Sequence, residues 1–165
     1  MVERTSMAAK EIEQKFLVSS LPDDFEQYPS DPIEQGYLAI SPDGREVRVR
    51  RKASKFFLTV KSGRGREREE HEIELSGGQF RTLWPATDGR RLKKTRYLIP
   101  FEAHTIELDI YHGRLEGLVT AEVEFESLEA SDGFSPPDWF GREITDDLRY
   151  KNQALARLGF PAETR

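Results

Sequence analysis

Residues 11–18 read Glu11-Ile12-Glu13-Gln14-Lys15-Phe16-Leu17-Val18. In a β-strand, successive side chains point to opposite faces, so Glu11, Glu13 and Lys15 share one face. The opposite face carries Ile12, Gln14, Phe16 and Val18. A charged strand face is usually a solvated surface. It can also hold a hard divalent cation together with an anion bound to that cation. Whether other strands repeat the pattern decides between these two interpretations.

The composition bounds the class of protein. The chain has 165 residues, enough for one domain with a sizeable core, and no second domain is predicted. It is 36% hydrophobic and 33% charged, and its 10% of aromatic residues argues against disorder. The absence of cysteine excludes disulfides and thiolate metal sites. The net charge of −5 argues against a nucleic-acid partner.

The sequence shows neither a membrane span nor a secretory signal. No apolar run is long enough to span a membrane, and the first residues do not resemble a secretory signal. We therefore expect a cytoplasmic protein without a membrane partner. Residues 1–9 are predicted to form a flexible leader, and residues 10–160 a single domain.

Strand-like runs recur along the chain and are separated by turn signals. They lie near residues 10–18, 34–40, 46–52, 56–61, 69–75, 92–99, 104–111 and 118–126. The turns between them include Pro42-Asp43-Gly44 and Ser62-Gly63-Arg64-Gly65. Eight strands with mostly short connections favour an antiparallel sheet, which could close into a barrel.

A short helix is predicted over residues 77–84. It would place Phe80, Leu83 and Trp84 on one side and would end at Pro85. Residues 127–141 are rich in serine, proline and acidic residues and are predicted to form a surface loop.

A second helix is predicted at the C-terminal end. Thr145 would be its N-cap, and Gly159 would end it. Leu148, Leu155 and Leu158 lie roughly on one face of such a helix, which indicates ordinary core packing.

The other strands repeat the separation of charged and apolar faces. Their basic side chains form a cationic set with Lys15, namely Arg48, Arg50, Lys61, Lys94 and Arg96. Their acidic side chains form an anionic set, namely Glu11, Glu13, Glu70, Glu72, Asp109, Glu122 and Glu124. The signs segregate largely by strand, although a sheet stabilised by its surface would pair opposite charges across strands.

Two architectures fit this pattern. In one, the apolar face packs inward and the charges face water. In the other, the sheet closes into a barrel whose lumen carries the charges. A carboxylate cluster in a narrow lumen raises its own pKa values unless a cation enters. Mg²⁺ or Mn²⁺ would satisfy it, and the cationic set would then bind phosphate. The residues alone leave both architectures open.

A series of short motifs along the chain bears on the choice between these two architectures. They are Glu11-x-Glu13-x-Lys15, Arg48-Val49-Arg50, Thr59-Val60-Lys61-Ser62, Glu70-His71-Glu72, Lys94-Thr95-Arg96-Tyr97, Glu107-Leu108-Asp109, Ala121-Glu122-Val123-Glu124-Phe125 and Tyr150-Lys151-Asn152. In this order the motifs resemble those of CYTH-domain proteins in the triphosphate tunnel metalloenzyme superfamily. The resemblance covers residues 10–158, and the compact length is similar to that of small bacterial members.

The resemblance implies a mainly β (α+β) fold, a closed eight-stranded antiparallel β-barrel or tunnel with a few covering helices and a C-terminal helix. It also implies residue roles. The metal positions are Glu11, Glu13, Asp109, Glu122 and Glu124. The phosphate-binding positions are Lys15, Arg48, Arg50, Lys61, Lys94, Arg96 and Lys151. Glu70 and Glu72 are further acidic lumen positions, and the catalytic candidates are Glu13, Lys15 and Glu11.

The resemblance favours metal-dependent hydrolysis of inorganic triphosphate, with Mg²⁺ or Mn²⁺ as cofactor. The alternatives are hydrolysis of ATP, another nucleoside triphosphate or thiamine triphosphate, and class IV adenylyl cyclase activity. A non-enzymatic polyphosphate-binding module is a further alternative, but such a module would not need so many carboxylates. The protein is expected to act as a monomer or a homodimer.

Overall fold

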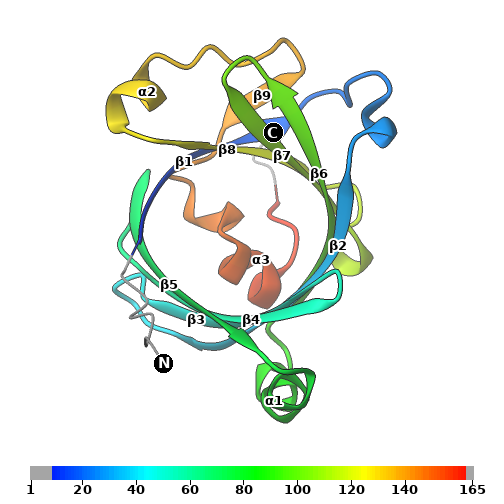
Figure 1. Cartoon of the computed structure of the whole chain (residues 1–165), viewed down its shortest axis with the longest axis vertical. Coiled ribbons are helices and arrows are strands. Elements are labelled where there is room, and N and C mark those ends of the chain that lie inside the picture. The colour runs from blue at the N-terminus through cyan, green and yellow to red at the C-terminus, as the bar shows by residue number, and fades with distance from the viewer. Residues whose placement is uncertain (1–8, 163–165) are drawn as a thin grey trace, which may run out of the picture.

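The computed structural model describes residues 9–162. Residues 1–8 of the leader predicted over residues 1–9 lie outside this range, and Ala9 is not part of a leader, because it begins the first strand. Nine antiparallel strands form one sheet in this range (Figure 1). They are β1 (Ala9–Val18), β2 (Ser30–Ile40), β3 (Glu46–Lys52), β4 (Lys55–Ser62), β5 (Glu67–Leu75), β6 (Arg91–Phe101), β7 (His104–Tyr111), β8 (Val119–Phe125) and β9 (Phe140–Glu143). The strand order is β5-β4-β3-β2-β6-β7-β8-β1-β9.

Strand β1 closes the sheet into a barrel. One of its edges pairs with β8, from Ile12 opposite Phe125 to Leu17 opposite Thr120. The first residues of its other edge pair with β5, from Ala9 opposite Glu70 to Ile12 opposite Glu67. Figure 1 looks down the resulting ring. The predicted eight-stranded antiparallel barrel is confirmed, with β9 as an additional strand.

Strand β9 was not predicted, because its first residues fall in the expected loop over 127–141. That segment also contains the short helix α2 (Leu128–Asp132). Strand β5 leaves the second half of β1 without a partner on one edge. There β9 pairs with Phe16 and Val18 and satisfies backbone groups that would otherwise be free.

The outer face of the barrel carries apolar side chains covered by short elements. Helix α1 (Gly77–Leu83) begins with a capping box between Ser76 and Gln79. Phe80 of α1 packs with Leu75 and Val49 of the barrel wall. The predicted helix over 77–84 is therefore confirmed, and the 3₁₀ turn η2 (Trp84–Thr87) follows it. The other 3₁₀ turns are η1 (Phe25–Gln27), η3 (Gly113–Leu115) and η4 (Leu148–Tyr150).

The predicted second helix begins later than expected. The chain is extended at Lys151, which separates η4 from the helix α3 (Asn152–Leu158). Thr145 is not an N-cap: its hydroxyl donates to the Glu143 carboxylate at 2.7 Å and accepts from the Lys15 backbone N–H at 3.0 Å. Thr145 therefore fastens this segment to β1.

Only one of the three leucines predicted for the core is buried. Leu155 is fully buried, whereas Leu148 is 55% and Leu158 75% exposed. Helix α3 lies inside the ring of strands in Figure 1, and the buried cluster around Leu155 includes Tyr37 and Tyr111 of the barrel wall. Helix α3 and its core cluster therefore fill one end of the barrel.

No helix within residues 9–162 is long and apolar enough to cross a membrane.

Candidate functional site

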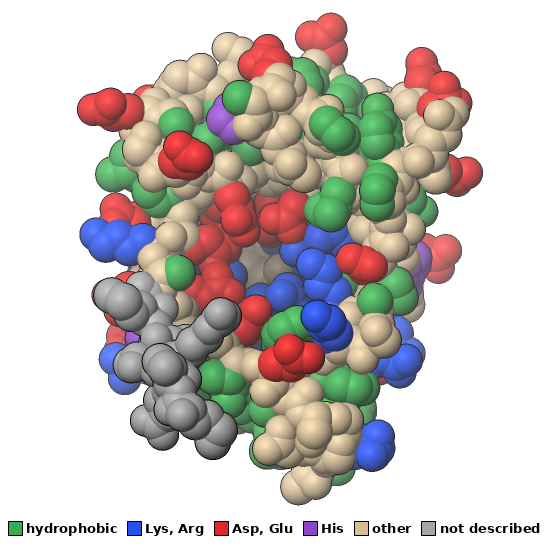
Figure 2. Space-filling view, viewed as in Figure 1, with side chains coloured by type: hydrophobic (Ala, Val, Ile, Leu, Met, Phe, Trp, Pro, Cys, Tyr) green, Lys and Arg blue, Asp and Glu red, His purple; other side chains and the backbone are tan. Residues whose placement is uncertain are grey.

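The open part of the barrel is a charged cavity of about 700 Å³. Its lining comes from the inward faces of the strands and from the segment before α3. Figure 2 shows a hollow with acidic side chains along one side and basic side chains along the other. Lys15, Lys61 and Lys94 are only 2–8% exposed, so the charged faces point into the lumen rather than to bulk water.

The structure brings almost all of the predicted site residues to this cavity. Its lining includes Glu11, Glu13, Lys15, Arg48, Arg50, Lys61, Glu70, Glu72, Lys94, Arg96, Glu122, Glu124 and Lys151. Asp109 is the exception, because it is fully buried in the wall and does not line the cavity.

Two lining residues of consequence were missed by the sequence analysis. Glu46 lies two residues before Arg48, and Arg68 lies two residues before Glu70. Each therefore shares a strand face with a predicted residue, and extending the period of two along these strands would have found them. Glu107, which the sequence placed beside Asp109 without giving it a role, also lines the cavity.

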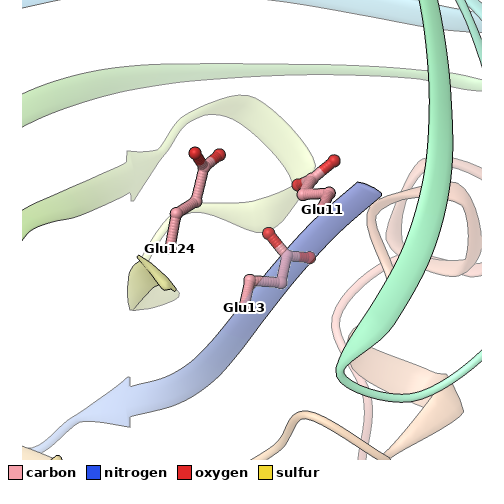
Figure 3. Close-up of side chains that lie close together, drawn as sticks. All are labelled: Glu11, Glu13 and Glu124. Atoms are coloured by element: carbon pink, nitrogen blue, oxygen red, sulfur yellow. The ribbon is translucent and has the colours of Figure 1, made fainter. Parts of the chain in front are cut away.

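Three carboxylates converge on one side of the cavity (Figure 3). An oxygen from each of Glu11, Glu13 and Glu124 lies within 4.8 Å of the others. Glu11 and Glu13 project from the same strand, and Glu124 projects from the neighbouring β8. Among the described residues, these three form the one group that could hold a metal ion.

The crowding of these carboxylates perturbs their titration. Burial raises the pKa of Glu13 well above its usual range, and the nearby Glu122 and Glu11 add to the effect. Glu124 is more exposed than the other two, but partial desolvation still raises its pKa to about 7, with Glu107 and Glu11 contributing. Glu11 differs, because its pKa lies well below the usual range although burial opposes its ionisation. The cause is Lys61, whose Nζ lies 3.0 Å from Glu11 Oε2, together with hydrogen bonds from neighbouring carboxyl groups.

This cluster has the chemistry of a divalent cation site. Carboxylate oxygens are the preferred ligands of Mg²⁺ and Mn²⁺. One oxygen of Glu11, Oε2, is buried and lies 3.0 Å from Lys61 Nζ, but it accepts no hydrogen bond of regular geometry within the described residues. A divalent cation would share Glu11 with Lys61 and would replace the protons that the crowded carboxylates otherwise hold.

The basic side of the cavity is held in place by Asp109. The Asp109 carboxylate accepts from Lys94 Nζ at 2.7 Å and from Arg96 Nε and Nη2 at 2.8 and 2.9 Å. Arg96 is also paired with Glu107. Both oxygens of Asp109 are thus engaged by cations, and Asp109 is not part of the carboxylate cluster.

The cations themselves are desolvated. Burial lowers the pKa of Lys94 to about 8, although Asp109 opposes the shift. Burial also lowers the pKa of Arg50 to about 10, and the neighbouring Arg48 and Arg96 contribute to this. The Nε atoms of Arg48 and Arg50 are buried and donate no hydrogen bond within the described residues. An anion in the cavity would compensate both the charges and the unused donors.

Lys15 lies where the two sides meet. Its Nζ donates to the Tyr150 carbonyl at 2.7 Å and lies 3.7 Å from Glu122 Oε1. The other oxygen of Glu122 lies 3.8 Å from Arg96 Nη2. Glu122 thus pairs with cations rather than with the cluster of Glu11, Glu13 and Glu124.

The sequence and the fold of the chain are similar to those of known proteins. The sequence profile of the CYTH domain matches residues 9–157. An inorganic triphosphatase of Nitrosomonas europaea is 47% identical over 148 residues, which cover 88% of this chain and 96% of that protein. An inorganic triphosphatase of Acetivibrio thermocellus is 38% identical over 151 residues, which cover 90% and 94% of the two chains. A crystal structure of an inorganic triphosphatase superposes with a TM-score of 0.67 at 45% identity, covering 89% of this chain and 94% of that one.

Proposed function

The chain belongs to the CYTH domain family, and from this premise we propose that it is a metal-dependent triphosphatase that hydrolyses inorganic triphosphate. The observation that carries the proposal is the division of one cavity into a carboxylate cluster and a facing set of buried cations. Phosphoryl transfer needs charge neutralisation and in-line positioning more than covalent chemistry, and this division supplies both.

Glu11, Glu13 and Glu124 would hold the divalent cation, Mg²⁺ or Mn²⁺. When bound, such a cation neutralises phosphate oxygens and makes a bound water more acidic. Glu13 orients the attacking water. Arg48, Arg50, Lys61, Lys94 and Arg96 bind the phosphate chain, and Lys15 and Lys151 reach it from the closed end of the barrel. Glu70 and Glu72 complete the acidic side.

Asp109 and Glu122 act through the cations that they contact. Asp109 fixes Lys94 and Arg96, and Glu122 fixes Lys15 and Arg96. Water then attacks the terminal phosphorus, the bridging P–O bond breaks, and orthophosphate and pyrophosphate form. The cationic set stabilises the negative charge that develops on the leaving oxygen.

The cavity lining supports an inorganic substrate. A nucleoside or thiamine group would need a free aromatic or apolar surface for stacking. His104 is the aromatic side chain in the described lining, and its ring packs edge-on against Phe125 and Phe134, at centroid distances of 5.2 and 5.5 Å. The lining otherwise offers few apolar groups, namely Leu98, Ala103 and Ala130.

Product analysis tests the proposal. The protein is incubated with tripolyphosphate, ATP or thiamine triphosphate, each with Mg²⁺ or Mn²⁺, and the products are separated by ion chromatography. We expect orthophosphate and pyrophosphate from tripolyphosphate, with slower turnover of the two organic substrates. Cyclic AMP and pyrophosphate from ATP would instead identify a cyclase, and binding without turnover would identify a polyphosphate-binding module.

A further inference from the structure

A second cavity of about 380 Å³ lies behind the closed end of the barrel. It is bounded by the β2–β3 turn around Gly44, the β4–β5 turn around Gly63, and the segment from η4 through α3. The two turns meet closely, because a Cβ on Gly44 would lie 3.1 Å from the Gly63 carbonyl oxygen. Gly44 and Gly63 both have positive φ, so these turns favour glycine and the cavity has a defined wall.

The lining of this cavity is cationic in an acidic protein. Five basic residues and one carboxylate, Glu46, face it, although the whole chain carries a net charge of −5. The five basic residues are Arg64, Arg68, Arg149, Lys151 and Arg157. Such a concentration of one sign attracts small anions.

Most of this positive charge is not compensated by carboxylates. Arg68 pairs with Glu46 at 3.4 Å, and Arg149 pairs with Asp147 at 2.7 Å. Arg64 and Arg157 donate instead to neutral oxygens, those of the Pro42 carbonyl and the Gln153 amide. Hydrogen bonds to neutral oxygens leave the charges of both arginines available to an anion.

Lys151 belongs to both cavities. It lines the tunnel and the second cavity, as do Arg68 and Glu46, so these three side chains form the partition between them. Within residues 9–162, no hydrogen bond or ion pair engages the Lys151 ammonium group. Burial and the neighbouring Arg68 lower its pKa, and the carboxylates of Glu13 and Glu122 oppose the shift. Because no carboxylate of the described residues contacts the ammonium group directly, an anion on either side of the partition would supply a direct ion pair.

The guanidinium group of Arg68 is held in a fixed orientation beside the second cavity. It donates to the Gly63 carbonyl at 3.2 Å, to the Gly44 carbonyl at 3.1 Å and to Glu46. These contacts fix the plane of the group beside Lys151, so little conformational entropy is lost when an oxyanion binds.

We propose that the second cavity is a binding site for a phosphate-class oxyanion, formed by Arg64, Arg68, Arg157 and Lys151. The choice of orthophosphate as the physiological ligand rests on the proposed function, since hydrolysis would generate it on the other side of the partition. Because Lys151 serves both cavities, an anion in the second cavity withdraws a cation from the tunnel. Orthophosphate then slows the reaction even at saturating substrate.

Binding is measured by titrating the full chain in EDTA with orthophosphate, and separately with a nucleoside monophosphate, while backbone amides are followed by ¹⁵N NMR. The amides of Gly63 and Arg64 report on the second cavity, and those of Glu13 and Glu124 report on the tunnel. We expect saturable shifts at Gly63 and Arg64. Tighter binding of the nucleoside monophosphate would support the site with an organic phosphate ester as its ligand.

Variants separate the two cavities. Arg64→Gln with Arg157→Gln should weaken phosphate binding, followed at the Gly63 amide, by about tenfold or more and leave the tunnel signals unchanged. Arg45→Gln with Arg51→Gln removes two exposed arginines that line neither cavity and should change nothing. Absence of shifts at Gly63 and Arg64, or equal loss in both double variants, would overturn the proposal.

Kinetics test the coupling through Lys151. In the wild-type protein, part of the inhibition by orthophosphate should persist at saturating tripolyphosphate. In the Arg64→Gln/Arg157→Gln variant that part should vanish while uninhibited turnover is unchanged, and purely competitive inhibition of the wild type would contradict the coupling. If the wild type hydrolyses no triphosphate, the proposed function fails, but the NMR titration still decides whether the second site exists.

Discussion

Glu11, Glu13 and Glu124 are brought within reach of one cation by chain segments more than 100 residues apart in the sequence. Burial raises the pKa of Glu13 and Glu124, whereas Lys61 keeps Glu11 ionised. Neighbouring side chains of identical chemistry therefore differ in charge because their contacts differ. The metal-free cluster holds protons that a divalent cation would displace.

Glu124→Gln tests the assignment of the metal site. The amide keeps the size of the side chain but removes a charged ligand, so we expect metal-dependent turnover to fall by about a hundredfold or more. Glu126→Gln is the matched control, because Glu126 lies two residues after Glu124 in the sequence. It lines the same cavity but does not belong to the cluster of Glu11, Glu13 and Glu124. Rates at saturating Mg²⁺ or Mn²⁺ decide, and equal rates in the two variants would remove Glu124 from the site.

Asp109→Asn tests whether the carboxylate in the wall is structural. Asp109 is fully buried and neutralises Lys94 and Arg96, so its loss should destabilise the fold by about 3–5 kcal/mol. Glu107→Gln should cost less, because the Glu107 side chain is 16% exposed and water can partly replace it. Urea unfolding measures both values, and an unchanged midpoint for Asp109→Asn would show that the two cations need no partner there.

The sequence predicted the strands more accurately than the C-terminal helix. The charged and apolar faces of the strands alternate with a period of two, and all eight predicted strands are present. The C-terminal segment carries a helical leucine pattern, but Thr145 binds β1 and the chain is extended at Lys151, so α3 is shorter than predicted. A tertiary contact overrides the local signal there, as also happens where β9 fills the edge that β5 leaves.

The residues of the site, like the strands, were predictable from the period-two pattern, but their burial in the fold was not. Period-two patterning places Lys15, Arg50 and Glu122 on the inner face, and the cavity lining agrees. The pattern gives the face of the sheet on which a side chain lies but not how deeply that side chain is buried, so Asp109 and Glu107 appear equivalent in the sequence. In the fold, Asp109 is fully buried, whereas Glu107 lines the cavity.

Leu155→Ala and Leu158→Ala form a matched pair on α3. Leu155 is fully buried in the cluster that fills one end of the barrel, so truncation should destabilise the protein by about 2–5 kcal/mol. Leu158 is 75% exposed, and its truncation should change stability by less than about 0.5 kcal/mol. Thermal unfolding compares them, and a similar loss in both would mean that α3 does not close the barrel through Leu155.

At the scale of the whole molecule, charge is sorted by position rather than mixed. Carboxylates line one side of the tunnel, buried cations line the other, and a second cationic cavity lies behind α3. A net charge of −5 conceals this distribution. Ion pairs such as Lys61 with Glu11 and Arg50 with Glu72 join the two sides, but the Nε atoms of Arg48 and Arg50 donate no hydrogen bond within the described residues and remain available to a ligand.

The stability of the metal-free protein should fall as pH rises from about 5 to 8. Hydrogen bonding to Glu11 and burial raise the pKa of Glu70 to about 7, and burial does the same for Glu124, against an ordinary value of 4.5. In this window the folded state holds protons that the unfolded chain has released, so deprotonation destabilises the fold. The lowered pKa values of Glu11 and Asp109 have no effect there, because both groups are already ionised in both states.

Urea midpoints at about pH 5.5 and 7.5, with EDTA or with Mg²⁺, check this expectation. We expect the higher midpoint at the lower pH in EDTA and a smaller or reversed difference with Mg²⁺, since metal replaces the protons. A midpoint in EDTA that rises with pH would contradict the raised pKa values.

The closing role of β1 sets the order in which the molecule can be completed. Among the described strands β1 is synthesised first, yet its partners β5, β8 and β9 end at residues 75, 125 and 143. Strand β1 must therefore wait for more than 100 further residues before all of its pairings can form, and contacts of such long sequence separation slow folding. Glu11 and Glu13 travel with it and cannot meet Glu124 until β8 has been synthesised, so a nascent chain that stops before β8 carries the motif without the metal centre.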